Sequence, residues 1–229
     1  MKERPILFSG PMVRAILEGR KTVTRRAVKG LQIPKEDPSQ GEIRQRWSAV
    51  GQRHARYGFC VFGETEDECA QELSEFGACP YGRPGDRLWV RENWMDLRGT
   101  GVEHRPTPDS PLQRYAYGAD SPPGSLSDET RKDFGLKWRP SIHMPRAACR
   151  ILLEITDVRV ERLQAITRSD IRAEGLQCPP ELASDDVSPN YRDWYPAAFR
   201  ELWSSTGGDW DANPWVWVVE FKRVEAAAA

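Results

Sequence analysis

The sequence predicts a mixed α/β domain, mostly strand, built as a small β-barrel with flanking helices. Short segments with strand-like alternation occur at 85–92, 148–160 and 214–223, well apart in the chain. Few helical segments lie between them, and they do not alternate regularly with strands as a parallel βαβ sheet requires. We therefore expect a single domain over residues 1–225.

The first elements are a strand, a helix and a second strand. Residues 5–9 are apolar and predict a short buried strand. Pro11 is suited to the first position of a helix, and apolar residues at helical spacing follow it. Gly19 is placed to end that helix, and the β-branched residues of 22–26 predict the next strand.

Two more helices are expected in the C-terminal third. Thr167 with Asp170 three residues later resembles a capping box, and Gly175 is suited to ending the helix that follows. Residues 190–203 have the apolar spacing of an amphipathic helix. Pro196 lies inside this segment and predicts a break there.

Two stretches lack a clear period. Residues 27–84 and 98–137 are polar and rich in glycine and proline, so we predict two irregular insertions into the domain. The rest of the chain carries the strands and helices of the barrel.

Composition excludes some classes of protein. The 229 residues carry a formal charge of −1, and no segment has the pattern of a signal peptide or a membrane span. We expect a cytoplasmic protein without a membrane partner.

The cysteines do not predict a metal site. Five are present, an odd number, and none forms a C-x-x-C pair, which indicates reduced thiols. His54, Cys60, Cys69 and Cys79 are the nearest approach to a zinc-binding set, but their spacing matches no standard motif. We expect neither a metal nor an organic cofactor.

Charge is unevenly distributed. Residues 1–57 hold 13 basic and 5 acidic residues, whereas residues 58–80 hold 6 acidic and no basic residues. A basic segment suits a surface that contacts phosphates. The alternative is that the acidic stretch folds back and neutralises it.

One segment resembles a known signature. Residues 16–26 read ILEGRKTVTRR: a helix end, a glycine, then a basic-Lys-Thr-x-Thr run that enters a strand. This run resembles the signature of the ASCH family of PUA-like proteins. The longer, prophage-type members are most similar overall, and the segments that carry the likeness are 16–26, 85–92, 138–145, 163–174 and 218–222.

The resemblance implies a PUA-like β-barrel with a cleft between barrel and helices. A compact bacterial member removes the acetyl group from N(4)-acetylcytidine, and the residues proposed for that reaction fall on Lys21, Thr24 and Glu174. Other members are reported to bind or cut RNA. This sequence departs from the compact enzyme at Arg25, where that enzyme has an apolar residue, and in its two insertions.

The signature residues suit acid–base chemistry. A threonine hydroxyl such as that of Thr24 attacks well only when a base takes its proton, and Lys21 can be that base only if its pKa falls. Arg20, Arg25 and Arg26 are close in sequence and would lower that pKa. The alternative is a charged Lys21 within a patch that binds phosphate.

Strand geometry raises a difficulty. In a regular strand Lys21 shares a face with Val23 and Arg25, while Thr24 shares the opposite face with Thr22. Lys21 and Thr24 converge only if Lys21 lies on the preceding turn or at a bulge. Thr22 therefore stays open as the nucleophile or as a hydrogen-bonding partner.

Glu174 is predicted in the last turn of its helix. A negative charge there opposes the helix dipole at a cost of about 0.3–1 kcal/mol, which favours a functional role. The alternative is an ordinary surface acid.

Trp89, Arg91 and Glu92 follow one another on the strand at 85–92. A tryptophan can stack on a base and an arginine can hold a phosphate, whereas the alternative is that Trp89 belongs to the core.

The sequence thus predicts an enzyme that acts on a nucleoside, a nucleotide or RNA. The favoured reaction is hydrolysis of the amide of an N-acylated cytosine nucleoside, with Thr24 attacking, Lys21 accepting its proton and Glu174 relaying protons. Arg26 would position the ligand. The other residues expected to bind the substrate are Arg20, Thr22, Arg25, Trp89, Arg91 and Glu92. The alternative is an RNA-binding module or a ribonuclease that uses the same basic cleft.

Overall fold

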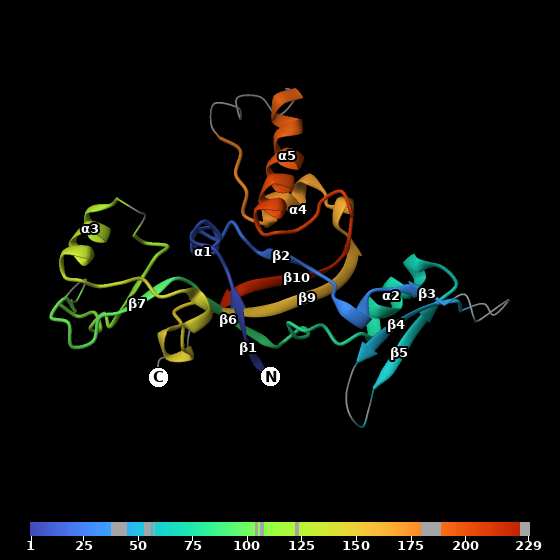
Figure 1. Ribbon diagram of the computed structural model, residues 1–229, viewed down its shortest axis with the longest axis horizontal. Coiled ribbons are helices and arrows are strands. Elements are labelled where there is room, and N and C mark those ends of the chain that lie inside the picture. The colour runs from blue at the N-terminus through green and yellow to red at the C-terminus, as the bar shows by residue number, and fades with distance from the viewer. Residues whose placement is uncertain are drawn as a thin grey trace. The chain divides into compact units, whose positions relative to one another are not determined.

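The structure is a computed structural model with two compact units (Figure 1). It describes residues 1–37, 45–52, 56, 58–103, 105, 108–121, 124–179 and 189–224, with the backbone alone for 189–193. Unit 1 comprises Met1–Lys2, Arg20–Asp86 and Glu154–Lys222, and unit 2 comprises Glu3–Gly19, Arg87–Leu153 and the residues from Arg223. No described helix is long and apolar enough to cross a membrane.

Five strands form the main sheet, in the order β1, β6, β9, β10, β2. Their bounds are Glu3–Leu7 for β1, Arg87–Arg91 for β6, Leu152–Arg162 for β9, Trp215–Val224 for β10 and Val23–Ala27 for β2. β1 is parallel to β6, and β2 is antiparallel to β10. The mixed α/β class is therefore confirmed.

The sheet is open in the part of the chain that the structure describes. β1 and β2 stand at the two ends of the strand order, and a closed barrel would need its end strands to pair. The closed barrel expected from the sequence is not found among these strands. The strands predicted at 85–92, 148–160 and 214–223 correspond to β6, β9 and β10, and β9 starts later than predicted because Arg146–Ala148 forms a 3-10 turn.

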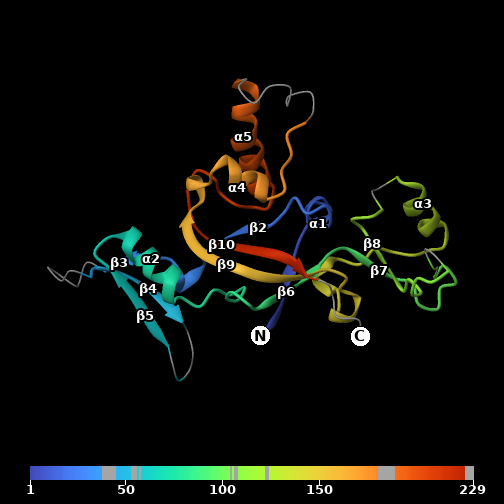
Figure 2. The ribbon, with the colours of Figure 1, turned by 180° about the vertical axis from the view of Figure 1, so that it is seen from behind.

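Helices α4 (Arg168–Ala173) and α5 (Pro189–Ser205) lie together over β2 and β10 (Figures 1 and 2). The predicted capping box of α4 is confirmed. Thr167 Oγ1 accepts the Asp170 N–H at 3.1 Å, and Asp170 Oδ2 accepts the Thr167 N–H at 3.2 Å. This box fixes where α4 begins and therefore where its last residues lie.

The break predicted at Pro196 is wrong, because α5 continues through it. A proline inside a helix removes one backbone hydrogen bond, at a cost of about 3 kcal/mol. Tyr195, Phe199 and Trp203 recur at intervals of four residues along α5, and all three are buried in the core between α5 and the sheet. Burial of three aromatic side chains offsets the loss at the proline.

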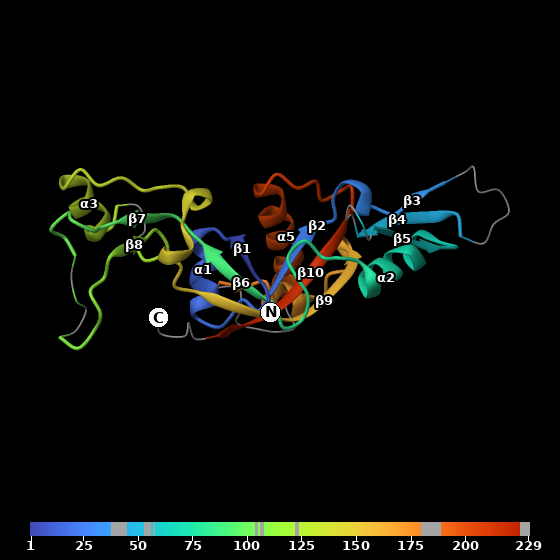
Figure 3. The ribbon, with the colours of Figure 1, turned by 90° about the horizontal axis from the view of Figure 1, so that it is seen from below.

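The first stretch predicted as irregular, residues 27–84, contains a second sheet and a helix. Its strands β3 (Lys35–Glu36), β4 (Trp47–Gln52) and β5 (Phe59–Gly63) pair in that order, and α2 (Glu66–Phe76) packs against them (Figure 3). Residues of this sheet and of α2 share a core with Trp215 and Trp217 of β10. The strands are short and half exposed, so their period was too weak to predict them.

Unit 2 contains α1 (Gly10–Leu17) beside β1, together with the ribbon of β7 (Trp94–Asp96) and β8 (Tyr115–Tyr117) and the helix α3 (Leu126–Asp133). The start and end predicted for α1 are confirmed, and Gly19 follows it with a φ of +76°. The second stretch predicted as irregular, 98–137, contains β8 and α3. The 3-10 turns are Gly30–Gln32, Ser141–His143, Arg146–Ala148 and Leu163–Ala165.

Candidate functional site

The turn before β2 is bonded to the end of α4. Lys21 and Glu174 form an isolated antiparallel bridge, and the Thr22 N–H donates to the Ala173 carbonyl at 2.8 Å. Glu174 is the C-terminal cap of α4, so the capping box at the helix start also determines where this residue lies. The bridge brings together two residues that are far apart in sequence.

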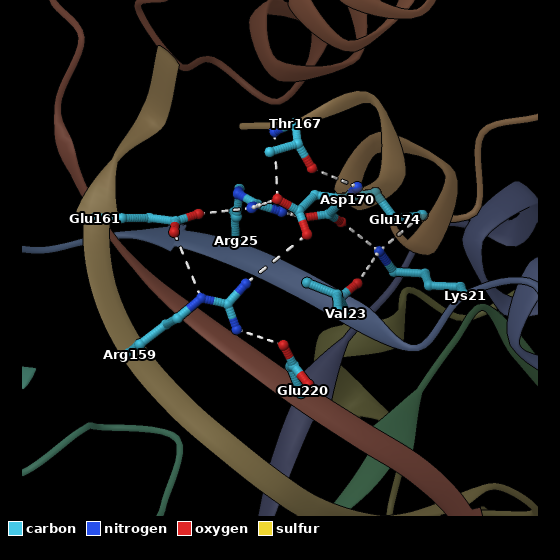
Figure 4. Close-up of polar contacts among 9 residues, drawn as sticks. All are labelled: Lys21, Val23, Arg25, Arg159, Glu161, Thr167, Asp170, Glu174 and Glu220. Atoms are coloured by element: carbon cyan, nitrogen blue, oxygen red, sulfur yellow. Dashed lines mark hydrogen bonds and ion pairs between the residues drawn. The ribbon is translucent and has the colours of Figure 1, made fainter. Parts of the chain in front are cut away.

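The Lys21 ammonium group is fully enclosed. Its Nζ donates to Glu174 Oε2 at 2.6 Å, to the Glu174 carbonyl at 2.9 Å and to the Val23 carbonyl at 2.8 Å (Figure 4). The side chain of Lys21 is 0% exposed and that of Glu174 is 4% exposed. Burial lowers the pKa of Lys21; the charge of Glu174 opposes this, and Arg26 and Arg25 add to it.

Arg25 lies in the same cluster. Its guanidinium group is 0% exposed and pairs with Glu161 at 2.6 Å and with Asp170 at 3.1 Å, and its Nη1 is 3.6 Å from Glu174 Oε1. Arg159 extends the cluster to Glu161 at 3.4 Å (Figure 4). Two arginines and a lysine thus face several carboxylates, which we call the Lys21 cluster: Lys21, Arg25, Arg159, Glu161, Asp170, Glu174 and Glu220.

Asp170 serves both the helix cap and this cluster. Burial alone would raise its pKa, but hydrogen bonds from Thr167 and the charges of Arg25 and Arg159 outweigh burial and lower it. Asp170 therefore stays ionised and links the start of α4 to the charged side chains beneath the helix.

Part of the cluster is not hydrogen-bonded. Glu174 Oε1 and the Nε and Nη1 atoms of Arg25 are buried and have no hydrogen-bond partner among the described residues. Buried polar atoms are usually bonded, and each exception calls for an explanation such as a bound water, a ligand or a catalytic role. Glu174 thus presents one oxygen that is bonded to Lys21 and one that makes no hydrogen bond among the described residues.

Thr24 is not brought to this pair. It is buried within β2 and is paired with Val219. Val23 packs under α4 and α5, and Arg25 reaches α4, so alternation along the strand places the Thr24 side chain on the opposite face. The structure therefore brings together two of the three residues implied by the resemblance, Lys21 and Glu174.

The other residues predicted around the signature differ in exposure. Thr22 is exposed, Arg26 is half-buried, and Arg20 donates to the Gly175 carbonyl at 2.5 Å. Arg25, predicted to bind substrate from a basic surface, is buried in the Lys21 cluster instead. Its three acidic neighbours hold it there.

Trp89, Arg91 and Glu92 belong to unit 2. Trp89 is buried, with the Arg91 guanidinium 4.6 Å from its ring centre, so it resembles a core residue more than an open stacking platform. Glu92 is 1% exposed and accepts two hydrogen bonds from Arg150. Burial raises the pKa of Glu92, and Arg150 acts against this rise.

Sequence reasoning missed Arg159, Glu161 and Glu220 as members of the cluster. A signal for two of them was present. Asp157, Arg159 and Glu161 recur every second residue in β9, so charges of both signs share one face of a strand that is otherwise apolar at its start. Such a stripe is expected where other charges lie opposite it.

No group of three or more His, Cys, Asp or Glu side chains suited to a metal ion is found within the described ranges. Of the four residues considered above, Cys60 is exposed and Cys69 is buried, and His54 lies outside the described residues. No family model, curated protein or solved structure matches the chain.

Proposed function

We propose that this protein is a cytoplasmic hydrolase of the ASCH type that cleaves the amide of an N-acylated cytosine nucleoside. The observation that supports it is the buried contact of 2.6 Å between Lys21 Nζ and Glu174 Oε2, beside a Glu174 Oε1 that makes no hydrogen bond among the described residues. A carboxylate with one fixed and one free oxygen is suited to proton transfer.

The proposed reaction uses both residues of this contact. Glu174 Oε1 takes a proton from water while the water oxygen bonds to the acyl carbon. Lys21, whose pKa burial lowers, gives a proton to the departing amine nitrogen as the carbon–nitrogen bond breaks. The proton on Glu174 then returns to Lys21 across their contact, and the products are a carboxylic acid and the free cytosine nucleoside.

Two further residues have roles in this scheme. Arg25 Nη1 lies 3.6 Å from Glu174 Oε1 and is placed to stabilise negative charge that develops beside that oxygen. Arg26 is half-buried and would position the ligand. Because Glu174 is almost fully buried, the C-terminal end of α4 must move from β2 when substrate enters.

The fold supports the same proposal in part. The helix end, glycine and basic run at 16–26 lead into β2, as in the ASCH signature, and Val218–Lys222 lies within β10, which pairs with β2. We propose that the main sheet corresponds to the sheet of a PUA-like barrel. Water takes the place of Thr24 as the nucleophile, since Thr24 lies on the other face of β2.

The geometry favours hydrolysis over RNA binding. A surface for the RNA backbone needs exposed arginines, and Arg25 is withdrawn into contacts with Glu161 and Asp170. RNA nevertheless belongs in the test, because Arg20 and Arg26 are not fully buried.

The test is incubation with N(4)-acetylcytidine, other N-acylated nucleosides and single-stranded RNA, with products identified by mass spectrometry. Deacylation should appear, and Lys21→Met and Glu174→Gln should each reduce it about 10²-fold or more. Lys222→Met is a matched control, because Lys222 forms an exposed ion pair with Glu154. RNA cleavage without deacylation would contradict the proposal.

Thr24→Val separates the two possible nucleophiles. The change preserves shape and removes the hydroxyl group. Activity should persist if water attacks, as the strand register indicates, and should fall with that of Lys21→Met if Thr24 attacks. Circular dichroism checks that each variant is folded.

A further inference from the structure

The outer side of α2 and the strand β5 form an aromatic and acidic surface in unit 1. Three phenylalanines are exposed there: Phe59 by 39%, Phe62 by 42% and Phe76 by 54%. Single exposed apolar residues are ordinary, but several gathered on one surface indicate a binding site. We call this surface the β5–α2 face.

Two adjoining cavities lie on the β5–α2 face. One, of about 420 Å³, is lined by all three phenylalanines. The other, of about 570 Å³, has four glutamates among its lining residues. Gln45, Phe62 and Glu72 line both, so the apolar hollow and the acidic one adjoin each other.

The charge of this face is of one sign. The acidic cavity is lined by Glu64, Glu68, Glu72 and Glu75, and residues 58–80 contain no lysine or arginine. Within the described part of the chain no ion pair engages these four, whereas Glu66 turns inward to Arg162 at 2.5 Å. Four carboxylates without a cation attract a positively charged partner.

Among the described residues, the strand β5 has a neighbouring strand on one side only. It stands at the end of its sheet, beyond β4, and Phe59–Gly63 contains neither a charge nor a proline. Proteins usually protect such edges with lysine, proline or a covering segment. An extended peptide can add to an edge of this kind through main-chain hydrogen bonds, with side chains entering adjacent pockets.

We propose that the β5–α2 face binds an extended, basic segment of a partner protein. Its backbone pairs with β5, its apolar side chains enter the phenylalanine cavity, and its lysines or arginines meet Glu72 and Glu75. The same carboxylates repel the phosphates of RNA. They also repel the same face of a second copy of this chain. The proposal is independent of the hydrolytic reaction.

The probe is a short fluorescent peptide that alternates lysine with valine, and binding is followed by anisotropy. The full-length protein should bind it with an affinity that falls as salt rises. Replacing lysine by glutamate in the peptide should abolish binding, and so should a central proline, which removes a main-chain donor.

Protein variants locate the site. Glu72→Lys with Glu75→Lys should weaken binding about tenfold or more. Phe62→Ser should also weaken it, and because Phe62 is exposed this variant should still fold. Glu129→Lys with Asp133→Lys on α3 is the matched charge reversal in unit 2 and should change nothing, since both residues are exposed.

Four results would overturn the proposal. They are no binding of the lysine–valine peptide, equal binding of the glutamate peptide, unchanged binding after the Glu72 and Glu75 reversals, and loss of binding in the α3 control to the same degree. In the last case the attraction would come from net charge alone.

Discussion

Glu92 in unit 2 and Glu174 in unit 1 are both buried carboxylates paired with cations, but they differ in how fully they are bonded. Arg150 donates to Glu92 Oε1 at 2.8 Å and to Oε2 at 3.0 Å. The same guanidinium pairs with Asp120 at 2.6 Å and lies 4.0 Å from the centre of the Tyr117 ring. Both oxygens of Glu92 are satisfied, which is typical of a structural ion pair.

Glu174 is bonded through one oxygen only. Oε2 accepts from Lys21 at 2.6 Å, whereas Oε1 lies 3.6 Å from Arg25 Nη1 and makes no hydrogen bond among the described residues. The comparison teaches that burial and a strong pair do not by themselves indicate function. A satisfied pair holds the fold, and an unsatisfied one has capacity left for a ligand.

The first prediction breaks each pair in turn. Lys21→Met leaves Glu174 buried without the cation that is hydrogen-bonded to it, and it should lower the free energy of unfolding by about 3–5 kcal/mol. Arg150→Met should cost less, about 1–3 kcal/mol, because Arg150 is partly exposed and water can replace it. Urea unfolding followed by tryptophan fluorescence measures both.

A double variant is the control for this prediction. Lys21→Met with Glu174→Met removes both charges and should recover much of the lost stability, since apolar residues can replace a buried pair. Equal losses of stability in Lys21→Met and Arg150→Met would contradict this prediction, because the two carboxylates would then depend equally on their cations.

The second prediction uses pH. The pKa of Lys21 is lowered from 10.5, so the unfolded chain binds more protons than the folded one just below pH 10.5, and the contribution of Lys21 to stability rises with pH there. The pKa of Glu92 is raised from 4.5, so its contribution is full below pH 4.5 and is lost as pH rises through the folded-state value.

The contribution of Lys21 to the free energy of unfolding should therefore rise with pH, and that of Glu92 should fall with pH. Each slope is at most about 1.4 kcal/mol per pH unit for one proton. The measurement is the free energy of unfolding against pH, with Lys21→Met and Glu92→Gln as the subtractions. If the free energy of unfolding of Lys21→Met still rises between neutral pH and pH 10.5, the rise comes from another titrating group.

Local signals predicted a good part of the fold. The strands β6, β9 and β10, the limits of α1 and the cap of α4 follow from alternation, a proline, a glycine and a Thr-x-x-Asp spacing. Closure of the sheet depends on distant pairing that no local pattern encodes. The same holds for the helix α5, where burial of aromatic side chains overrides Pro196.

The candidate site was predictable only in part. Alternation already showed that Lys21 and Arg25 share a face from which Thr24 is excluded, and the structure has this arrangement. The ion pair between Arg25 and Glu161 could not be predicted, because it requires β9 and β2 to lie on the two sides of β10 with a particular register. A basic run in sequence therefore gave a buried ion cluster rather than a basic surface.

The smallest predicted effect concerns two helix caps, and it tests whether α4 matters beyond stability. Thr167 Oγ1 accepts the Asp170 N–H at 3.1 Å at the start of α4, and Thr65 Oγ1 accepts the Glu68 N–H at 3.2 Å at the start of α2. Replacing either threonine by alanine should cost about 1 kcal/mol of stability, since in both helices the hydroxyl acceptor is lost and a backbone N–H of the first turn is left without a partner. Only Thr167→Ala should also lower the rate of deacylation, because α4 carries Glu174 at its end. Parallel measurement of urea midpoints and initial rates separates the two effects, and equal rates in both variants would show that the position of α4 does not control the Lys21–Glu174 pair.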